Sequence, residues 1–501
     1  MLASGAFLSH QPCDYFDGAF HPLQGDEIVT RDPAQPTRVV WTGTPNFDHA
    51  QRAVDAARRA FPAWSARTVE ERRIFLERWR EVCVRHAARL AAAISREVGK
   101  VKWEAELEAK IVAEKVTITL EDRVLARVTG FSVEAGAGKT GICSFRPHGV
   151  MAVLGPFNFP AHLPNGHIVP ALLLGNTIVF KPSEKAAAVG QLMAELAHEA
   201  GFPPGVFNVV QGTAAIAARL STHRNVDGVL FTGSFPVGRR ILEANLDTPG
   251  RLIALEMGGS NPAVVLQSAD LRRAAIECVR AAFATTGQRC TCTRRLIVED
   301  SIADHFIPTI LKLASNLVIA AADDGVPAFM GPLVTSGARE AVLTAQQTLA
   351  SQGRLLLEAT PLTREGHFLS PGVVEVDRFT RSSDESEVFG PFLQISRARD
   401  LDDAIEQSNA TNFGLAASLF SSNESQWEQF RAECRAGCVN WNTGTAGASS
   451  KLPFGGLGRS GNHRPAGAFA VDAVVYPVAT MIDRADPIIP QGMCVDARFF
   501  A

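Results

Sequence analysis

The chain has 501 residues, of which 46% are hydrophobic and 20% are charged, a balance typical of globular proteins and not of disordered ones. At about 150 residues per domain, this length predicts two or three domains, each able to bury its own core. The formal net charge is −3, so no basic excess is available to bind nucleic-acid phosphates. Composition therefore argues against a dedicated nucleic-acid-binding protein.

The nine cysteines are an odd number without densely paired spacings, which fits free thiols in a reducing compartment. Residues 1–17 have no basic region ahead of an apolar stretch and do not resemble a signal peptide. Apolar runs such as 169–174 and 177–180 fall well short of the roughly 18 residues that a membrane-spanning helix needs. We therefore expect a soluble, cytoplasmic protein.

The N-terminal part of the chain changes character after about residue 45. Before it, Pro, Gly and Asp predict an irregular arm with short strands. Thr68-Val69-Glu70-Glu71 is a capping box, in which the first side chain and Glu71 satisfy free backbone N–H groups at a helix start. The apolar residues that follow at helical spacing, and that we expect in the core, are Phe75, Trp79, Val82, Leu90 and Ile94.

Strand-like and helical patterns alternate over residues 149–266. The strand-like runs are 150–154, 176–180, 206–210, 226–231, 251–255 and 263–266, and the helical ones include 186–200, 214–220 and 237–244. This alternation predicts a parallel sheet covered on both faces. Such sheets bind ligands beyond the carboxyl ends of their strands.

A second α/β stretch follows, from a helix at 270–286 and a strand at 293–298 to about residue 435. The segment 127–146 and the tail after Phe469 contain alternating residues, which predict an added β-ribbon. Gly136-Ala137-Gly138-Lys139-Thr140 partly matches a phosphate-binding loop, but Val133 occupies the place of the first glycine and the next residues are strand-like. A glycine-rich turn is the better interpretation.

The strongest chemical signal is Gly287-Gln288-Arg289-Cys290-Thr291-Cys292, between a helix and a strand. A cysteine at such a junction can face a cleft, where nearby backbone N–H groups favour its thiolate. A buried, inert thiol is the alternative. A metal site that adds Cys434 and Cys438 is disfavoured, because neither pair has the usual zinc spacing and no histidine cluster accompanies them.

Two further motifs place a polar residue at the end of a predicted strand. In Leu255-Glu256-Met257-Gly258-Gly259, the Glu256 carboxylate is partly desolvated at the end of an apolar strand. This raises its pKa toward that of a general base. The alternative is a glutamate that pairs with a nearby cation. Gly155-Pro156-Phe157-Asn158-Phe159-Pro160 is a rigid loop whose amide could stabilise an oxyanion, although this motif by itself favours an ordinary turn Asn.

Two segments have the properties of a dinucleotide site. Lys181-Pro182-Ser183-Glu184 follows one predicted strand. A second segment connects the end of another strand to the start of a helix; it is Phe231-Thr232-Gly233-Ser234-Phe235-Pro236-Val237-Gly238. Lys181 and Glu184 are placed to hold ribose hydroxyls, and the turn at 233–238 to approach a diphosphate. Neither segment contains a G-x-G-x-x-G motif, so this pattern alone is a weak indication.

Together, and in this order, these segments resemble the aldehyde dehydrogenase superfamily over about residues 35–480. Further agreement lies in Glu387-Val388-Phe389-Gly390-Pro391, Asn440-Trp441-Asn442, Pro453-Phe454-Gly455-Gly456 and Ser460-Gly461. Three stretches are similar to one branch of the superfamily, the bacterial N-succinylglutamate 5-semialdehyde dehydrogenases of arginine breakdown. They are His162-Leu163-Pro164-Asn165-Gly166-His167, Cys290-Thr291-Cys292 and Gly461-Asn462-His463-Arg464.

The resemblance implies NAD-dependent oxidation of that semialdehyde to N-succinyl-L-glutamate. Cys290 attacks the aldehyde carbon to form a thiohemiacetal, Asn158 and the Cys290 backbone N–H stabilise the oxyanion, and Glu256 activates water to hydrolyse the thioester. The residues implied to bind NAD are Lys181, Ser183, Glu184, Gly233, Ser234, Phe235, Pro236, Val237, Gly238, Glu387 and Phe389, and no metal is implied. Glu184 as a ribose partner favours NAD over NADP.

The implied substrate carries two carboxylates, which need cationic or hydrogen-bonding partners; Arg289, His463 and Arg464 are the candidates. The alternatives are another carboxylated semialdehyde, a cofactor-free thiol esterase, and a non-catalytic scaffold relative. Retention of Cys290, Glu256 and Asn158 together argues against the scaffold.

The fold implied is α/β with three parts. A Rossmann-type NAD-binding domain takes residues 1–126 and 147–255, and an α/β catalytic domain takes 256–435, with 436–469 returning to the cleft. Residues 127–146 and 470–501 form an oligomerisation ribbon and tail. Its strand edges are exposed unless a second subunit covers them, so we expect a homo-oligomer, a dimer or a tetramer.

Overall fold

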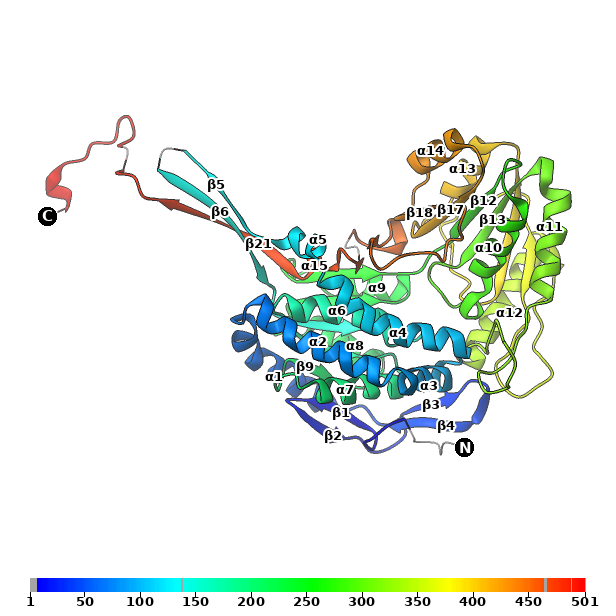
Figure 1. Cartoon of the computed structure of the whole chain (residues 1–501), viewed down its shortest axis with the longest axis horizontal. Coiled ribbons are helices and arrows are strands. Elements are labelled where there is room, and N and C mark those ends of the chain that lie inside the picture. The colour runs from blue at the N-terminus through cyan, green and yellow to red at the C-terminus, as the bar shows by residue number, and fades with distance from the viewer. Residues whose placement is uncertain (1–6, 137, 464–465, 488, 501) are drawn as a thin grey trace.

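The computed structural model describes residues 7–136, 138–463, 466–487 and 489–500. Two seven-stranded sheets, each with its own helices, form the two bodies of the molecule, and a three-stranded ribbon projects away from them (Figure 1). The α/β fold expected from the sequence is confirmed. No helix in the described ranges is both long and apolar enough to cross a membrane.

The first sheet has the strand order β11-β10-β7-β8-β9-β1-β2. Its strands are β7 (Val150–Leu154), β8 (Thr177–Lys181), β9 (Phe207–Val209), β10 (Gly228–Thr232), β11 (Leu252–Glu256), β1 (Cys13–Phe16) and β2 (Ala19–Pro22). Strands β7 to β11 are parallel, and the N-terminal hairpin β1–β2 adds an antiparallel edge. After β7 the chain adds β8 and β9 on one side of that strand, and then β10 and β11 on its other side. The strand order therefore reverses between β7 and β10, and a crevice opens beyond the carboxyl ends of these two strands.

Helices cover both faces of this sheet. They are α1 (Phe47–Ser65), α2 (Val69–Arg85), α3 (Ala87–Val98), α4 (Lys102–Thr119), α5 (Asp122–Leu125), α6 (His162–Leu173), α7 (Ala187–Ala200), α8 (Ala214–Thr222) and α9 (Phe235–Glu243). The capping box of Thr68 and Glu71 is present, which confirms the predicted helix start. The apolar stripe after it is shared between α2 and α3, which His86 separates.

The second sheet has the order β14-β15-β16-β13-β12-β17-β18. Its strands are β12 (Asn261–Val265), β13 (Thr293–Glu299), β14 (Arg354–Leu357), β15 (Gly372–Glu375), β16 (Phe392–Ala398), β17 (Ala416–Phe420) and β18 (Cys438–Trp441), and its helices are α10 (Leu271–Phe283), α11 (Asp300–Ser315), α12 (Ser336–Ala350), α13 (Leu401–Asn409) and α14 (Glu424–Glu433). The sequence grouped the run at 263–266 with the first sheet, and that was wrong. As β12 it pairs with β13 and β17, because the glycines after β11 let the chain cross to the second body.

The ribbon consists of β5 (Phe131–Glu134), β6 (Lys139–Pro147) and β21 (Val475–Asp483). All its pairings are antiparallel, which confirms the predicted β-ribbon. The residue after Gly136 lies outside the described part, and strand β6 begins at Lys139, so no helix follows this glycine-rich turn. The remaining elements are β3 (Ile28–Asp32), β4 (Gln35–Gly43), β19 (Pro453–Phe454), β20 (Ala466–Gly467) and α15 (Ala470–Ala473).

Candidate active site

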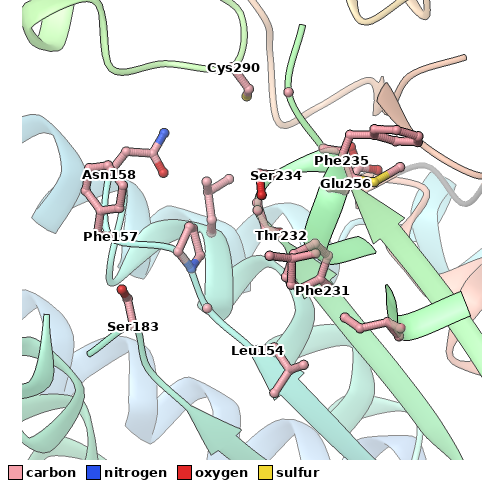
Figure 2. Close-up of a pocket in the computed structure, with 18 of the residues that line it drawn as sticks. Leu154, Phe157, Asn158, Ser183, Phe231, Thr232, Ser234, Phe235, Glu256 and Cys290 are labelled. Atoms are coloured by element: carbon pink, nitrogen blue, oxygen red, sulfur yellow. The ribbon is translucent and has the colours of Figure 1, made fainter. Parts of the chain in front are cut away.

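A cavity of about 1130 Å³ opens at the crevice of the first sheet. The carboxyl ends of β7, β8, β10 and β11 form one wall, and the loop that carries Cys290 approaches from the second body. Figure 2 shows Cys290, Asn158 and Glu256 around this space, each from a different segment. The structure therefore brings together the three residues that the sequence singles out for catalysis.

The loop of Cys290 is held by side chains distant in the sequence. Asn261, the first residue of β12, donates from Nδ2 to the carbonyl oxygens of Cys290 and Cys292, at 2.7 and 2.8 Å. Just before the loop, Thr285 and Thr286 have φ values of 53° and 55°, a left-handed conformation that costs energy for β-branched residues. The surrounding bonds therefore hold this strained turn in one position.

The Cys290 thiol is protonated in its resting environment. Burial raises its pKa, and the negative charges of Glu387 and Glu256 raise it further. The backbone N–H of Cys290 favours the thiolate, as expected, but it offsets the raised pKa only in part. The thiolate needs a base to take its proton.

Asn158 lies in the loop between β7 and α6 and is buried. Its Nδ2 donates one hydrogen bond to the Gln288 carbonyl oxygen, at 2.9 Å. An amide nitrogen carries two hydrogens, so a second one is free for an oxyanion beside Cys290. Phe157 and Phe389 meet edge to face, 5.9 Å between ring centroids, and border this part of the cavity with apolar surface.

Glu256 ends β11 and is 5% exposed. Neither carboxyl oxygen has a hydrogen-bond partner of ordinary geometry among the described residues. Burial raises the pKa of this carboxyl well above its usual value, and the backbone N–H of Ala466 opposes that shift only in part. A desolvated, unpaired carboxylate that faces a cavity is suited to remove a proton from a thiol or a water molecule.

The two glycines after Glu256 allow three functional groups to approach one another. A Cβ at Gly258 would lie 2.0 Å from Glu387 Oε2, and one at Gly259 would lie 2.7 Å from the Cys290 carbonyl oxygen. Burial raises the pKa of Glu387 to about 7, against the effect of Arg294, whose guanidinium lies 3.4 Å away. Burial thus favours the neutral form of Glu387, which lines the cavity beside Cys290.

The cofactor side of the cavity is built on α9. Ser234 is its N-cap but makes no side-chain cap bond. Ser234 and Phe235 line the cavity, where their N–H groups are available to an anion. Lys181 is buried and pairs with Glu184 at 3.5 Å, and burial lowers its pKa. A helix start, a buried cation and a long crevice fit an anionic dinucleotide.

Nearly all the residues that the resemblance assigned to NAD line the cavity: Lys181, Ser183, Glu184, Gly233, Ser234, Phe235, Pro236, Val237, Glu387 and Phe389. Gly238 does not line it. A Cβ at this position would lie 2.4 Å from the Met257 sulfur, so Gly238 permits close packing of α9.

The candidate carboxylate partners of the substrate are placed differently. Arg289 donates to Glu104 Oε1 and to Thr285 Oγ1, both at 2.7 Å, and it does not line the cavity. His463 is exposed and does not line it either. Arg464 lies outside the described residues.

Helix α4 supplies polar groups that sequence reasoning missed. Glu108 accepts hydrogen bonds from the backbone N–H groups of Ala161 and His162, both at 3.0 Å, and binds Lys100 at 2.6 Å. Glu104, one turn earlier, accepts from Thr285. One helix therefore braces both the loop of Asn158 and the loop of Cys290. The signal that could have identified them in the sequence is the presence of charged residues on the apolar face of a helix.

The second cysteine of the doubled motif points away from the cavity. Cys292 is fully buried, and its thiol donates to the Ala284 carbonyl oxygen at 3.7 Å. All nine cysteines are free thiols. In the described ranges, no group of three or more His, Cys, Asp and Glu side chains is arranged to hold a metal ion.

The chain matches the family model for the aldehyde dehydrogenase family over residues 20–478. It is 42% identical over 469 residues to N-succinylglutamate 5-semialdehyde dehydrogenase of Caulobacter sp. (strain K31), covering 93% of this chain and 95% of the relative. It is 43% identical, with the same coverage, to N-succinylglutamate 5-semialdehyde dehydrogenase 2 of Caulobacter vibrioides.

Solved structures are similar over most of the chain. One is 1-pyrroline-5-carboxylate dehydrogenase from Thermus with bound NAD, with a TM-score of 0.88 and 29% identity over 95% of this chain and 93% of that one. Another is gamma-glutamyl-gamma-aminobutyraldehyde dehydrogenase from Burkholderia cenocepacia, with a TM-score of 0.89 and 31% identity over 96% of this chain and 98% of that one.

Proposed function

The chain belongs to the aldehyde dehydrogenase family, and on that premise we propose that it oxidises N-succinyl-L-glutamate 5-semialdehyde to N-succinyl-L-glutamate with NAD. The observation that carries the proposal is the convergence of Cys290, Asn158 and Glu256 on one cavity with a dinucleotide crevice. Full-length similarity to relatives that bear this substrate's name supports the choice of aldehyde.

Catalysis begins with the thiol of Cys290. Glu256 is the unpaired base of the cavity and accepts the thiol proton, which leaves the thiolate to attack the aldehyde carbon. The carbonyl oxygen gains the negative charge of the resulting thiohemiacetal. The second Nδ2 hydrogen of Asn158 and the Cys290 backbone N–H stabilise that oxyanion.

Bound NAD supplies the redox chemistry, because its nicotinamide ring accepts the hydride from the former aldehyde carbon. The protein then has to hydrolyse the thioester on Cys290. Glu256 first releases the thiol proton to solvent and then removes a proton from water, whose oxygen attacks the thioester carbon, and the Cys290 sulfur leaves as the thiolate. A buried carboxylate in this position favours hydrolysis over acyl transfer to coenzyme A.

The cofactor residues divide by chemistry. The start of α9 offers the backbone N–H groups of Ser234 and Phe235 to the diphosphate, and Lys181 and Glu184 bind the adenosine ribose. A carboxylate next to the ribose repels a 2′-phosphate, so Glu184 selects NAD. Glu387 and Phe389 position the nicotinamide end, since both border the space beside Cys290.

Formation of NADH tests the proposal. The purified protein and Cys290→Ala are given N-succinylglutamate 5-semialdehyde, succinic semialdehyde and glutamic semialdehyde with NAD. Preference for the succinylated aldehyde, lost in Cys290→Ala, is the expected result. A preference for another semialdehyde would keep the mechanism and change the substrate. Ester cleavage without NADH from any aldehyde would contradict the proposal in favour of a thiol esterase, and no reaction at all would favour a scaffold.

We also propose that the protein is a cytoplasmic homo-oligomer. The outer strands of the ribbon expose their edges (Figure 1), and exposed edges pair with another chain unless they are covered. Free cysteines suit a reducing compartment. Light scattering after size-exclusion chromatography measures the mass, and a mass equal to the 53.7 kDa chain would contradict the oligomer.

A further inference from the structure

The cavity wall contains a buried cation that the mechanism does not use. Of the lysines and arginines that line the cavity in the described ranges, Lys181 and Lys115 are the buried ones. Lys181 pairs with Glu184 on the cofactor side. Lys115 comes from α4, and its charge acts on His162, which comes soon after Asn158 in the chain and lines the same cavity. This places Lys115 on the Asn158 side, away from the pair of Lys181 and Glu184.

Among the described residues, Lys115 has no counter-charge. Its Nζ donates to the Gly467 carbonyl oxygen at 2.6 Å, and none of the described acidic side chains forms an ion pair with it. An ammonium group has three hydrogens, so two remain for a ligand. Burial lowers the pKa of Lys115 to about 8, and the group is still mostly charged at neutral pH. A desolvated cation without an anion is unfavourable, and a ligand carboxylate would relieve that cost.

His162, the first residue of α6, supplies a second unsatisfied group. Its Nδ1 is buried and has no hydrogen-bond partner among the described residues. Burial, together with the charges of Lys115 and Lys100, lowers its pKa to about 3, so the ring is neutral. A neutral imidazole carries one N–H, and the Nδ1 tautomer can donate it to an anion.

Gly166 leaves room for that anion. It follows His162 by one helical turn, so both lie on the same face of α6, and both line the cavity. A Cβ at Gly166 would meet nothing within 4 Å. Glycine weakens a helix interior, which makes this empty space a functional feature rather than a packing requirement. The neighbouring His167 is already engaged with Thr232 Oγ1 at 3.2 Å.

We propose that Lys115 and His162 bind one carboxylate of the aldehyde substrate in the space beside Gly166. The ammonium supplies charge and the imidazole a directional hydrogen bond. The inference rests on the proposed function, since it names the residues that select a carboxylated aldehyde at the same site. Lys115 and His162 are then determinants of specificity, acting on substrate binding and not on the chemical step.

The test compares kcat/KM for N-succinylglutamate 5-semialdehyde with kcat/KM for hexanal, which has no charge. Loss of a hydrogen bond to a charged group predicts a fall in this ratio of about 10- to 100-fold in Lys115→Met, mainly through KM. His162→Leu lowers it less. Lys110→Met is the matched control, because Lys110 lies on the same helix with its side chain 72% exposed and pairs with Glu114; it leaves the ratio unchanged.

Gly166→Val is the second variant, and it keeps Lys115 in place. It fills the space and lowers the same ratio, so the proposal stays testable if Lys115→Met does not fold. The pH dependence of wild type adds a readout that a structural role would not move. KM for the dicarboxylate aldehyde rises as pH rises through the pKa of Lys115 and the cation is lost, while KM for hexanal lacks that dependence.

The outcomes separate this inference from the proposed function. A wild-type enzyme without preference for the succinylated aldehyde would contradict the proposed function. A wild-type enzyme with that preference, combined with Lys115→Met and Gly166→Val variants that lower kcat/KM equally for both aldehydes, would overturn the carboxylate site alone.

Discussion

Arg289, the residue before Cys290, forms a 2.7 Å ion pair with Glu104 of α4, and the two side chains are 15% and 2% exposed. The same Glu104 oxygen accepts from the backbone N–H and the hydroxyl of Thr285, at 2.9 and 2.8 Å. A carboxylate from the first body thus holds the strained turn that presents the nucleophile of the second.

Glu104→Ala removes the acceptor of a buried guanidinium, and we expect a loss of about 3–5 kcal/mol of stability. We also expect a lower kcat for charged and uncharged aldehydes alike, because the Cys290 loop loses its support. Chemical denaturation and NADH formation measure the two effects. Glu106→Ala is the control, since Glu106 is exposed and lies 4.0 Å from Lys102; it changes stability by about 0–1 kcal/mol. An Arg289→Ala effect confined to KM for the dicarboxylate aldehyde would contradict this bracing role.

We expect substitutions of the two cysteines in the doubled motif to have different effects on activity. Cys290→Ala lowers kcat by roughly three orders of magnitude or more, because the covalent step is lost. Cys292→Ala keeps most of the activity, since its thiol points to the Ala284 carbonyl oxygen and away from the cavity. Labelling with iodoacetamide followed by mass spectrometry should modify Cys290 in wild type. Inactivation of Cys292→Ala to the level of Cys290→Ala would disprove the assignment.

Activity should rise with pH. Burial raises the pKa values of both Glu256 and Cys290, and each acts in its deprotonated form, so kcat falls as pH falls through these raised values. Glu256→Gln lowers the hydrolysis step by roughly 10²- to 10⁴-fold and removes the corresponding limb of the pH profile. Stopped-flow measurements should show a slowed first turnover as well, because the same carboxylate accepts the thiol proton. An unchanged pH profile in Glu256→Gln would exclude it as the base.

Asn261 connects β12 to the loop of Cys290. Its amide donates to two carbonyl oxygens of the Cys290 loop, and its Oδ1 accepts from the Ala416 N–H at 2.9 Å. Asn261→Ala leaves these buried groups without partners and should cost about 2–4 kcal/mol, with a lower kcat. Asn316→Ala, at an exposed helix end, is the control. Equal melting temperatures of the two variants would refute the prediction.

We expect Glu184 to determine the preference of the protein for NAD over NADP. Its side chain is 45% exposed beside the buried Lys181, and its charge opposes a 2′-phosphate. Glu184→Ser should lower the ratio of kcat/KM for NAD to that for NADP by about tenfold or more, since it removes both a ribose partner and a repulsion. Glu243→Ser is the control, because Glu243 pairs with Arg239 on an exposed part of α9. A ratio that moves in neither variant would remove Glu184 from the ribose site.

Sequence reasoning proposed the candidate catalytic residues from patterns that are local to each segment. Cys290, Asn158 and Glu256 follow the ends of regular elements, and parallel sheets gather such ends at one edge, so their shared cavity could be expected. The α/β fold, the capping box at Thr68 and the β-ribbon were also predictable, because hydrophobic periodicity and turn residues are local properties of the chain.

The tertiary structure decided what depends on contacts between distant segments. In the sequence, Glu104, Glu108 and Lys115 are simply three charged residues of one helix. The packing of α4 shows that Glu104 and Glu108 bind the loops of Cys290 and Asn158. It also shows that Lys115 has no counter-charge among the described residues. The same holds for Arg289, whose partner lies 185 positions away, and for the pKa of Cys290, which burial raises. Burial and pairing are properties of the three-dimensional neighbourhood, so the sequence alone could name the reacting groups but not the residues that hold and tune them.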